Sequence, residues 1–139
     1  MIYWDTSALM KVYSAAEDQH ARAVNLKVAK VRHLSSAFVG LELQGAICSR
    51  LFLDKRHLTA MLEKASEDMK DWTFLAVDPH LEYAKVLCER YGLRGADALH
   101  LASALAVRRD FSPKVRFASA DRPQLAAAQA ERLKVIDLS

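Results

Sequence analysis

Hydrophobic residues along the chain fall into two kinds of pattern. Short runs of β-branched and aromatic residues, bounded by polar or turn-forming residues, are typical of buried strands. Longer segments with apolar residues three and four positions apart indicate amphipathic helices. Strands are therefore expected at residues 2–4, 72–77, 115–118 and 134–136, with the short segment 33–36 as a further candidate. Helices are expected at residues 7–13, 17–30, 38–53, 58–69, 79–91, 95–109 and 123–132.

The order of these elements predicts the topology. Strands alternate with helices along the chain, which predicts a parallel sheet with helices on both faces. The chain has 139 residues, 52% of them hydrophobic, which is the size of one ordinary domain. No linker, repeat or low-complexity tract divides it. We therefore expect an α/β fold with a single domain over residues 1–139.

Composition argues against several classes of protein. No apolar segment approaches the roughly 18 residues that a membrane span requires, and no N-terminal targeting segment is visible, so a cytoplasmic protein is expected. Cys48 and Cys88 lie far apart in the sequence, and neither has a second cysteine beside it. This spacing favours buried free thiols over a disulfide or a zinc site. Glycine-rich phosphate loops are absent as well, since the chain contains neither GxGxxG nor a P-loop.

The first candidate for chemistry is Asp5, at the junction of the first strand and the first helix. It follows the apolar run 2–4 and precedes two hydroxyl residues, Thr6 and Ser7. Asp5 is therefore expected at the carboxyl end of a strand, which is the edge where open α/β sheets bind ligands. The alternative is that Asp5 or Thr6 only caps the following helix.

A second candidate, Glu42, is expected on an apolar helix face. Its neighbours three and four positions away are Phe38, Val39, Gly45 and Ala46. Burial of an unpaired carboxylate is costly unless the charge is paired or bound to a metal. Glu42 is therefore a candidate metal ligand, and a salt bridge to a distant arginine or lysine is the alternative.

Asp97 is the third candidate, in the first turn of a helix that has almost no polar face. Backbone N–H groups and the helix dipole stabilise negative charge there, which supports either a capping role or a ligand role. His100 follows one turn later and forms an Asp-x-x-His pair with it. A single histidine on an apolar helix is more often a hydrogen-bonded core residue than a metal ligand, so we expect the core role for His100.

Asp121 follows the expected strand 115–118 through Ser119 and Ala120. It is therefore expected at the same sheet edge as Asp5. The sequence Asp121-Arg122-Pro123 is also a good helix start, so Asp121 is expected to cap this helix as well.

Taken together, the four acids predict a metal site. Four carboxylates in one cleft repel one another, and such a cluster persists at neutral pH only with cations to neutralise it. Oxygen ligands without cysteines or paired histidines favour magnesium or manganese over zinc. The chemistry suited to this arrangement is displacement at a phosphodiester. The formal net charge of +3 is weak support for a polyanionic substrate.

These residues resemble the PIN-domain ribonucleases, and within them the VapC-like toxins of type II toxin–antitoxin pairs. The resemblance covers essentially the whole chain and rests on four segments in a characteristic order. They are residues 5–9 (DTSAL), Glu42, residues 94–102 (RGADALHLA) and residues 119–121 (SAD). One departure is the end of the last helix, where the family commonly has a glycine and this chain has Glu131-Arg132-Leu133.

The resemblance implies a three-layer α/β/α sandwich with a central parallel sheet. It implies an Mg²⁺- or Mn²⁺-dependent endoribonuclease that cleaves RNA through Asp5, Glu42, Asp97 and Asp121, both as metal ligands and as catalytic groups. Thr6 and Ser119 match hydroxyl positions that support the carboxylates or the substrate. Flanking cations, namely Lys11, Arg94 and Arg122, are candidates for RNA phosphate contacts or ordinary surface charges.

The resemblance also implies two protein partners, a second copy in a homodimer and a small antitoxin. The helices at 38–53 and 58–69 suit such contacts, because their apolar stripes are larger than one small core can cover. An antitoxin is expected to place an apolar helix on this surface and to aim an arginine at the carboxylates, since an arginine fork matches carboxylates. The alternative is a PIN-like module that binds RNA or protein without cutting.

Overall fold

A five-stranded parallel sheet forms the centre of the structure, a computed structural model that describes all 139 residues. The strand order is β3-β2-β1-β4-β5, so the first strand lies in the middle. The candidate strand at 33–36 is confirmed. The strands are β1 (Ile2–Trp4), β2 (His33–Ser36), β3 (Thr73–Leu75), β4 (Arg116–Ser119) and β5 (Lys134–Asp137).

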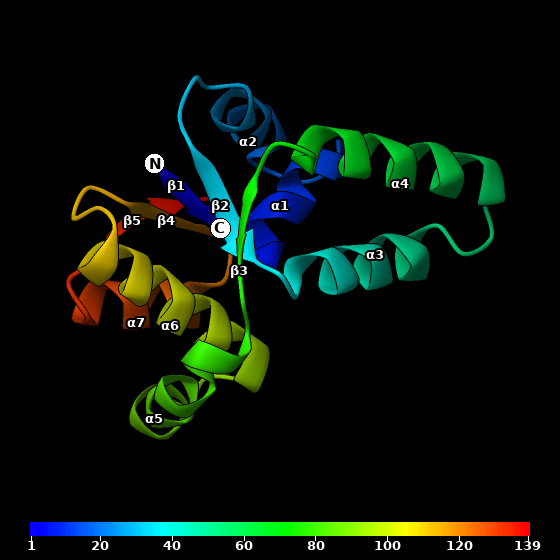
Figure 1. The fold of residues 1–139 in the computed structure, drawn as a ribbon. Coiled ribbons are helices and arrows are strands. Elements are labelled where there is room, and N and C mark those ends of the chain that lie inside the picture. The colour runs from blue at the N-terminus through cyan, green and yellow to red at the C-terminus, as the bar shows by residue number, and fades with distance from the viewer.

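Seven α-helices and one short 3-10 helix cover the two faces of this sheet (Figure 1). This arrangement confirms the expected α/β/α sandwich with a central parallel sheet. The α-helices are α1 (Thr6–Tyr13), α2 (His20–Lys27), α3 (Val39–Arg50), α4 (Lys55–Met69), α5 (Leu81–Tyr91), α6 (Gly95–Asp110) and α7 (Arg122–Ala130), and the 3-10 helix η1 is Asp78–His80.

Alternate residues of the central strand build two separate hydrophobic cores. Tyr3 points to one face, where it joins the core formed with α5, α6 and α7. Ile2 and Trp4 point to the other face, where they join the core formed with α1 to α4. Successive side chains of a strand point to opposite faces, so the uninterrupted apolar run Ile2–Trp4 is what a strand covered on both sides requires.

The register of the two middle strands sets the position of the candidate site. Trp4 pairs with Ala118, and the Asp5 N–H donates to the Ala118 carbonyl at 3.0 Å. Asp5 and Ser119 therefore lie beside each other at the carboxyl edge of the sheet. This edge is where ligands bind in folds of this type.

The predicted helix at 17–30 is wrong in its extent. The observed helix α2 begins only at His20, after Gln19 adopts a left-handed φ of 67°, and it ends at Lys27. Ala23 is the only fully buried residue of α2, and Val28, which lies inside the predicted range, is 65% exposed. The hydrophobic pattern therefore overestimated the length of this helix.

The turn at the end of α7 accommodates the missing glycine of the family pattern. Arg132 adopts a φ of 60°, the left-handed conformation that glycine takes without steric cost. The chain therefore makes the same kind of helix exit with an arginine, at some cost in backbone strain. Gly92 makes the corresponding exit from α5 at a φ of 66°.

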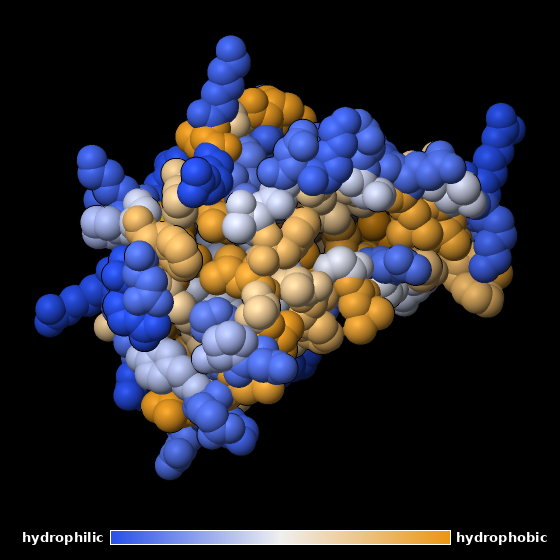
Figure 2. Space-filling view, in the orientation of Figure 1, coloured by the Kyte–Doolittle hydropathy of each residue, from blue (hydrophilic) through white to orange (hydrophobic).

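Helices α3 and α4 form a hairpin that projects away from the sheet (Figure 1). Hydrophobic surface lies over this hairpin in Figure 2, and Phe52 and Leu53 at its tip are 64% and 96% exposed. No helix of the chain is both long enough and apolar enough to cross a bilayer.

Candidate active site

Asp5 is almost completely buried, with 2% of its surface exposed. Its Oδ2 accepts hydrogen bonds from the backbone N–H of Ser7 at 3.0 Å and from the Ser7 hydroxyl. The Ser119 hydroxyl lies 3.3 Å from the same oxygen. Asp5 therefore does cap α1, and this capping fixes its carboxylate at the sheet edge. The two alternatives drawn from the sequence are compatible in the structure.

Gln124 is a part of this network that the sequence reasoning missed. It is fully buried in the first turn of α7. Its Oε1 accepts from the Ser119 hydroxyl at 2.7 Å, and its Nε2 donates to the Asp97 carbonyl at 2.9 Å, with a longer contact of 3.4 Å to Asp5 Oδ1. Gln124 therefore ties β1, β4 and α6 together. The feature of the sequence that could have identified Gln124 is its position as a polar residue directly before the apolar run 125–128.

Glu42 enters the same edge from the first turn of α3. Its Oε2 accepts from the Thr6 hydroxyl at 2.6 Å and lies 2.6 Å from His100 Nε2. Burial raises the pKa of the Glu42 carboxyl, but the hydrogen bonds from His100 and Thr6 outweigh burial and lower the pKa. The partner of this carboxylate is therefore a histidine rather than the arginine or lysine considered from the sequence.

His100 has the core role expected for it, since it is fully buried and hydrogen-bonded through both ring nitrogens. Nδ1 lies 3.1 Å from the Tyr3 hydroxyl, opposite the contact to Glu42. Burial lowers the pKa of His100, but the hydrogen bond to Glu42 and the charges of Asp5, Glu42 and Asp97 outweigh burial and raise the pKa.

The pKa of Asp97 shows the effect of the neighbouring acids. Its pKa is raised from 3.8 to about 6 by burial first, and then by the negative charges of Asp5, Asp121 and Glu42. Asp97 lies in the first turn of α6, whose start at Arg94 has no side-chain cap. The capping alternative for Asp97 is therefore wrong, and the carboxylate faces three others at one edge of the sheet.

Asp121 caps α7, as expected from its sequence context. Its Oδ1 accepts from the Gln124 N–H at 2.8 Å, and its own N–H donates to the Ser119 hydroxyl at 3.0 Å. Because Ser119 ends β4 beside Asp5, this contact places Asp121 at the same edge of the sheet. Asp121 is thus the acid whose position is most fully explained by helix capping.

Each of the four acids has at least one carboxylate oxygen that accepts no short hydrogen bond from the chain. Glu42 Oε1 and Asp121 Oδ2 have no hydrogen-bond partner, and Asp5 Oδ1 has only the long contact to Gln124. Carboxylate oxygens are the donors that Mg²⁺ and Mn²⁺ prefer, so the donor set fits such an ion. However, no three His, Cys, Asp or Glu side chains stand as a preformed metal cluster. Side-chain movements would have to complete the ligand set.

The cations next to the acids in sequence are placed differently from one another. Lys11 pairs with Glu17 at 3.0 Å, which satisfies its charge within the chain. Arg94 and Arg122 are exposed at the starts of α6 and α7. These two arginines remain candidates for phosphate contacts.

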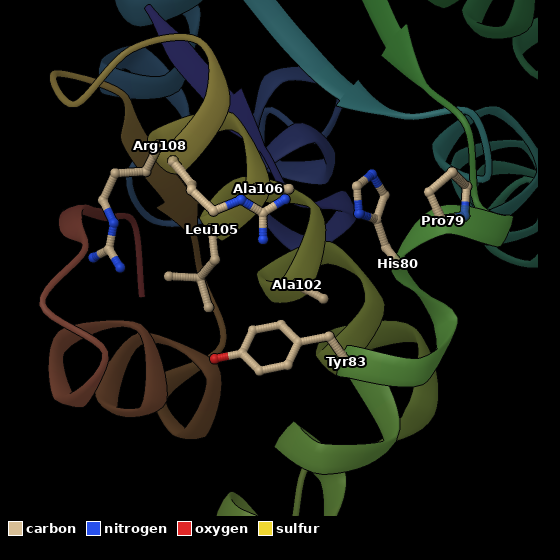
Figure 3. Close-up of a pocket in the computed structure, with 8 residues that line it drawn as sticks. Pro79, His80, Tyr83, Ala102, Leu105, Ala106 and Arg108 are labelled. Carbon is tan, nitrogen blue, oxygen red and sulfur yellow. The ribbon is translucent and has the colours of Figure 1, made fainter.

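The hollow drawn in Figure 3 is distinct from the acidic edge. It has a volume of about 230 Å³ and lies along the second half of α6, whereas Asp97 and His100 lie in the first two turns. No acid lines it, and its two arginines already have partners within the chain. Arg108 donates to the Glu131 carbonyl and Arg109 to the Asp110 carboxylate.

We predict that Gln124→Leu destabilises the protein by about 2 kcal/mol, because it removes the closest acceptor of the buried Ser119 hydroxyl and the side-chain donor to the Asp97 carbonyl. Urea unfolding in the presence of EDTA measures this change. The matched control is Gln129→Leu on the exposed side of the same helix, with an expected change below about 0.5 kcal/mol. Equal effects of the two substitutions would contradict a bridging role for Gln124.

Comparisons with known proteins agree with this architecture. The crystal structure of VapC20 from Mycobacterium tuberculosis, named as a sarcin–ricin loop cleaving toxin, is similar with a TM-score of 0.69 and 20% identity, covering 91% of this chain and 95% of that one. FitAcB from Neisseria gonorrhoeae is similar with a TM-score of 0.68 and 17% identity, covering 99% and 97%.

VapBC2 from Rickettsia felis, solved with a DNA fragment from its promoter, is similar with a TM-score of 0.63 and 13% identity, and both chains are covered completely. At these identities the likeness concerns the fold. A search among curated proteins finds no match. The PIN domain model matches residues 2–111, which is most of the chain. The chain therefore belongs to the PIN domain family.

Proposed function

We propose that this protein is a divalent-metal-dependent endoribonuclease that cleaves RNA at the edge formed by Asp5, Glu42, Asp97 and Asp121. The observation that carries the proposal is the convergence of these four acids at the carboxyl edge of the sheet, where burial first and then the neighbouring negative charges raise the pKa of Asp97 to about 6. A protein keeps such a cluster at the expense of stability, so a function that needs it is expected. Membership of the PIN domain family supports the same conclusion.

The residues of the chain supply the positioning. A divalent ion held by these carboxylates would activate water and stabilise charge on the scissile phosphate and the leaving oxygen. Ser7, Ser119 and the α1 backbone fix Asp5, while Thr6 fixes Glu42. RNA phosphates would be repelled by the bare acids, so metal binding and substrate binding are expected to be coupled.

The purified protein tests the proposal directly. It should cleave single-stranded RNA with Mn²⁺ or Mg²⁺, lose this activity in EDTA and regain it when metal is added back. Asp5→Asn should abolish cleavage, whereas Asp71→Asn, at an exposed position away from the site, should not. Cleavage that persists in EDTA, or full activity of Asp5→Asn, would contradict the proposal. RNA binding without cleavage would instead favour a non-catalytic PIN-like module.

We further propose that the protein is the toxin of a toxin–antitoxin pair, acting on RNA in the cytoplasm as a homodimer. The likeness in fold to VapC20, which is named a toxin, supports this assignment. A hollow of about 320 Å³ lies between the α3–α4 hairpin and the end of α1, and a second of about 240 Å³ lies between α3 and α4, both lined mostly by apolar residues. Ile47 lines both hollows, Met61 lines the larger one, and Leu62 lines the smaller one. An apolar helix of a small antitoxin fits this surface, and an arginine from it could neutralise the carboxylates.

Expression without a partner tests the toxin assignment. The wild-type protein should arrest growth of its native host, and Asp5→Asn should be harmless at the same expression level. Tagged Asp5→Asn should then recover a small basic partner from that host, and light scattering should give the mass of a dimer. A harmless wild type that recovers no partner would contradict the toxin assignment while leaving the nuclease proposal intact.

A further inference from the structure

His100 is a buried titratable group that neither the capping network nor the proposed metal ligands account for. Its imidazole is fully buried and lies where β1, α3 and α6 meet. Nδ1 is 3.1 Å from the Tyr3 hydroxyl, and Nε2 is 2.6 Å from Glu42 Oε2. The next carboxylate oxygen, Oδ1 of Asp5, is 3.9 Å from Nε2, too far for a hydrogen bond.

The hydrogen bonds of His100 to Tyr3 and Glu42 determine which ring nitrogen carries a proton toward Glu42. Tyr3 is fully buried, and burial raises the pKa of its phenol, so it remains an O–H group. The ionised Glu42 carboxylate can only accept, so when His100 is neutral its ring proton is on Nε2, and Nδ1 accepts from the Tyr3 hydroxyl. When His100 is protonated, Nε2 carries a proton as well. In both states Nε2 therefore donates to Glu42 Oε2.

Both donors that reach Glu42 act on the same oxygen. Thr6 donates its hydroxyl to Oε2 at 2.6 Å, and His100 Nε2 lies 2.6 Å from the same oxygen and 3.2 Å from the Thr6 hydroxyl. Glu42 Oε1 has no partner from the chain. A carboxylate held in this way has one oxygen fixed and one oxygen available, which is how outer hydrogen bonds orient metal ligands.

We propose that His100, oriented by Tyr3, is a positioning residue that fixes Glu42 through Oε2 and so leaves Oε1 to bind the divalent ion. The proposal rests on the proposed metal-dependent function and adds a residue to it. His100 is not itself a ligand, because Glu42 and Tyr3 occupy its two ring nitrogens. Loss of such an outer partner typically costs about 10–100-fold in metal affinity or activity.

The test measures Mn²⁺ binding to the purified full-length protein without RNA, by calorimetry or by the electron spin resonance signal of free Mn²⁺. His100→Leu removes the donor at similar volume and should weaken Mn²⁺ binding about 10–100-fold. His100→Gln can still donate from its amide and should restore most of the affinity. His57→Leu, at an exposed position on α4, is the matched control and should bind like the wild type.

A double-mutant cycle separates positioning from a merely structural role. If His100 acts through Glu42, His100→Leu should cause little further loss of Mn²⁺ affinity in a Glu42→Gln background. In RNA cleavage, the metal concentration for half-maximal rate should rise more than the maximal rate falls. Should His100→Leu fail to fold, His100→Asn takes its place, since its amide is too short to reach Glu42 from the same backbone position.

The outcomes distinguish this inference from the proposed function. Wild-type Mn²⁺ affinity in every folded variant without the donor would overturn the role of His100 and leave the nuclease proposal standing. An equal weakening of binding by His100→Leu in the wild-type and Glu42→Gln backgrounds would overturn that role as well. A wild-type protein that neither binds Mn²⁺ nor cleaves RNA would overturn both proposals.

Discussion

Asp97→Asn is expected to make the metal-free protein more stable while it removes the nuclease activity. Activity should fall by more than about a hundredfold, because even an outer partner of a metal ligand typically accounts for about 10–100-fold. Stability should rise because the variant removes one negative charge from a cluster in which charges repel. A single substitution that moves stability and activity in opposite directions is typical of a group that is kept for function.

The stability effect of Asp97→Asn should depend on pH in a defined way. In the folded protein the pKa of Asp97 is about 6, against 3.8 ordinarily. Between these two values the folded state holds a proton that the unfolded state has lost, so wild-type stability falls as pH rises from about 4 to about 6. Asparagine does not titrate. The gain from Asp97→Asn should therefore be close to zero at pH 4 and about 1–2 kcal/mol at pH 8, after allowance for partial exposure.

Urea unfolding in EDTA at pH 4 and at pH 8 measures both values. Asp71→Asn, at an exposed position, is the control and should change stability by less than about 0.5 kcal/mol. A variant that is less stable than the wild type at pH 8 would show that Asp97 is not under net repulsion. Full nuclease activity of the same variant would remove it from the candidate site.

Mg²⁺ or Mn²⁺ is expected to stabilise the wild-type protein by about 2.7 kcal/mol at a hundred times its Kd, because it binds only the folded state. For a chain of this length the corresponding rise in Tm is roughly 8 °C. Glu42→Gln should show less than about half of this rise, since the neutral amide loses the charge attraction to the ion. Differential scanning calorimetry with and without metal measures the shift.

Two controls make the Glu42 result specific. Glu63→Gln removes an acid from the exposed face of α4 and should keep the full metal-induced shift. Sodium chloride at matched ionic strength should raise the Tm much less than the divalent ion does, because screening alone weakens the repulsion only in part. A metal-induced shift of equal size in Glu42→Gln would exclude Glu42 from the metal site.

The sequence was informative wherever position along an element determines position in the fold. Asp5 and Asp121 follow strands, and parallel strands end at one edge, so both acids could be placed there without a structure. Asp97 could be placed in the first turn of α6 because this helix was expected to begin at Gly95. The alternation of strands and helices along the chain likewise predicted the parallel sheet.

Contacts between residues far apart in sequence could not be predicted in this way. His100 meets Glu42 across 58 positions and Gln124 meets Asp5 across 119, and no local pattern encodes either pair. The start of α2 was missed for a different reason, because the left-handed conformation of Gln19 leaves no signature in the hydrophobic pattern. Backbone conformation at single residues and long-range polar pairing therefore explain most of what the sequence left open.

The most direct measurement of the central claim is the position of Mn²⁺ in crystals of the protein, determined from anomalous scattering. We expect Mn²⁺ at the carboxyl edge of the sheet, with oxygen ligands from Asp5, Glu42 and Asp97 and with Asp121 nearby. Crystals of Asp97→Asn grown under the same conditions should show a weaker anomalous Mn²⁺ peak or none. Mn²⁺ bound elsewhere, or no Mn²⁺ at a concentration that supports RNA cleavage, would contradict the claim that these four carboxylates form the metal centre.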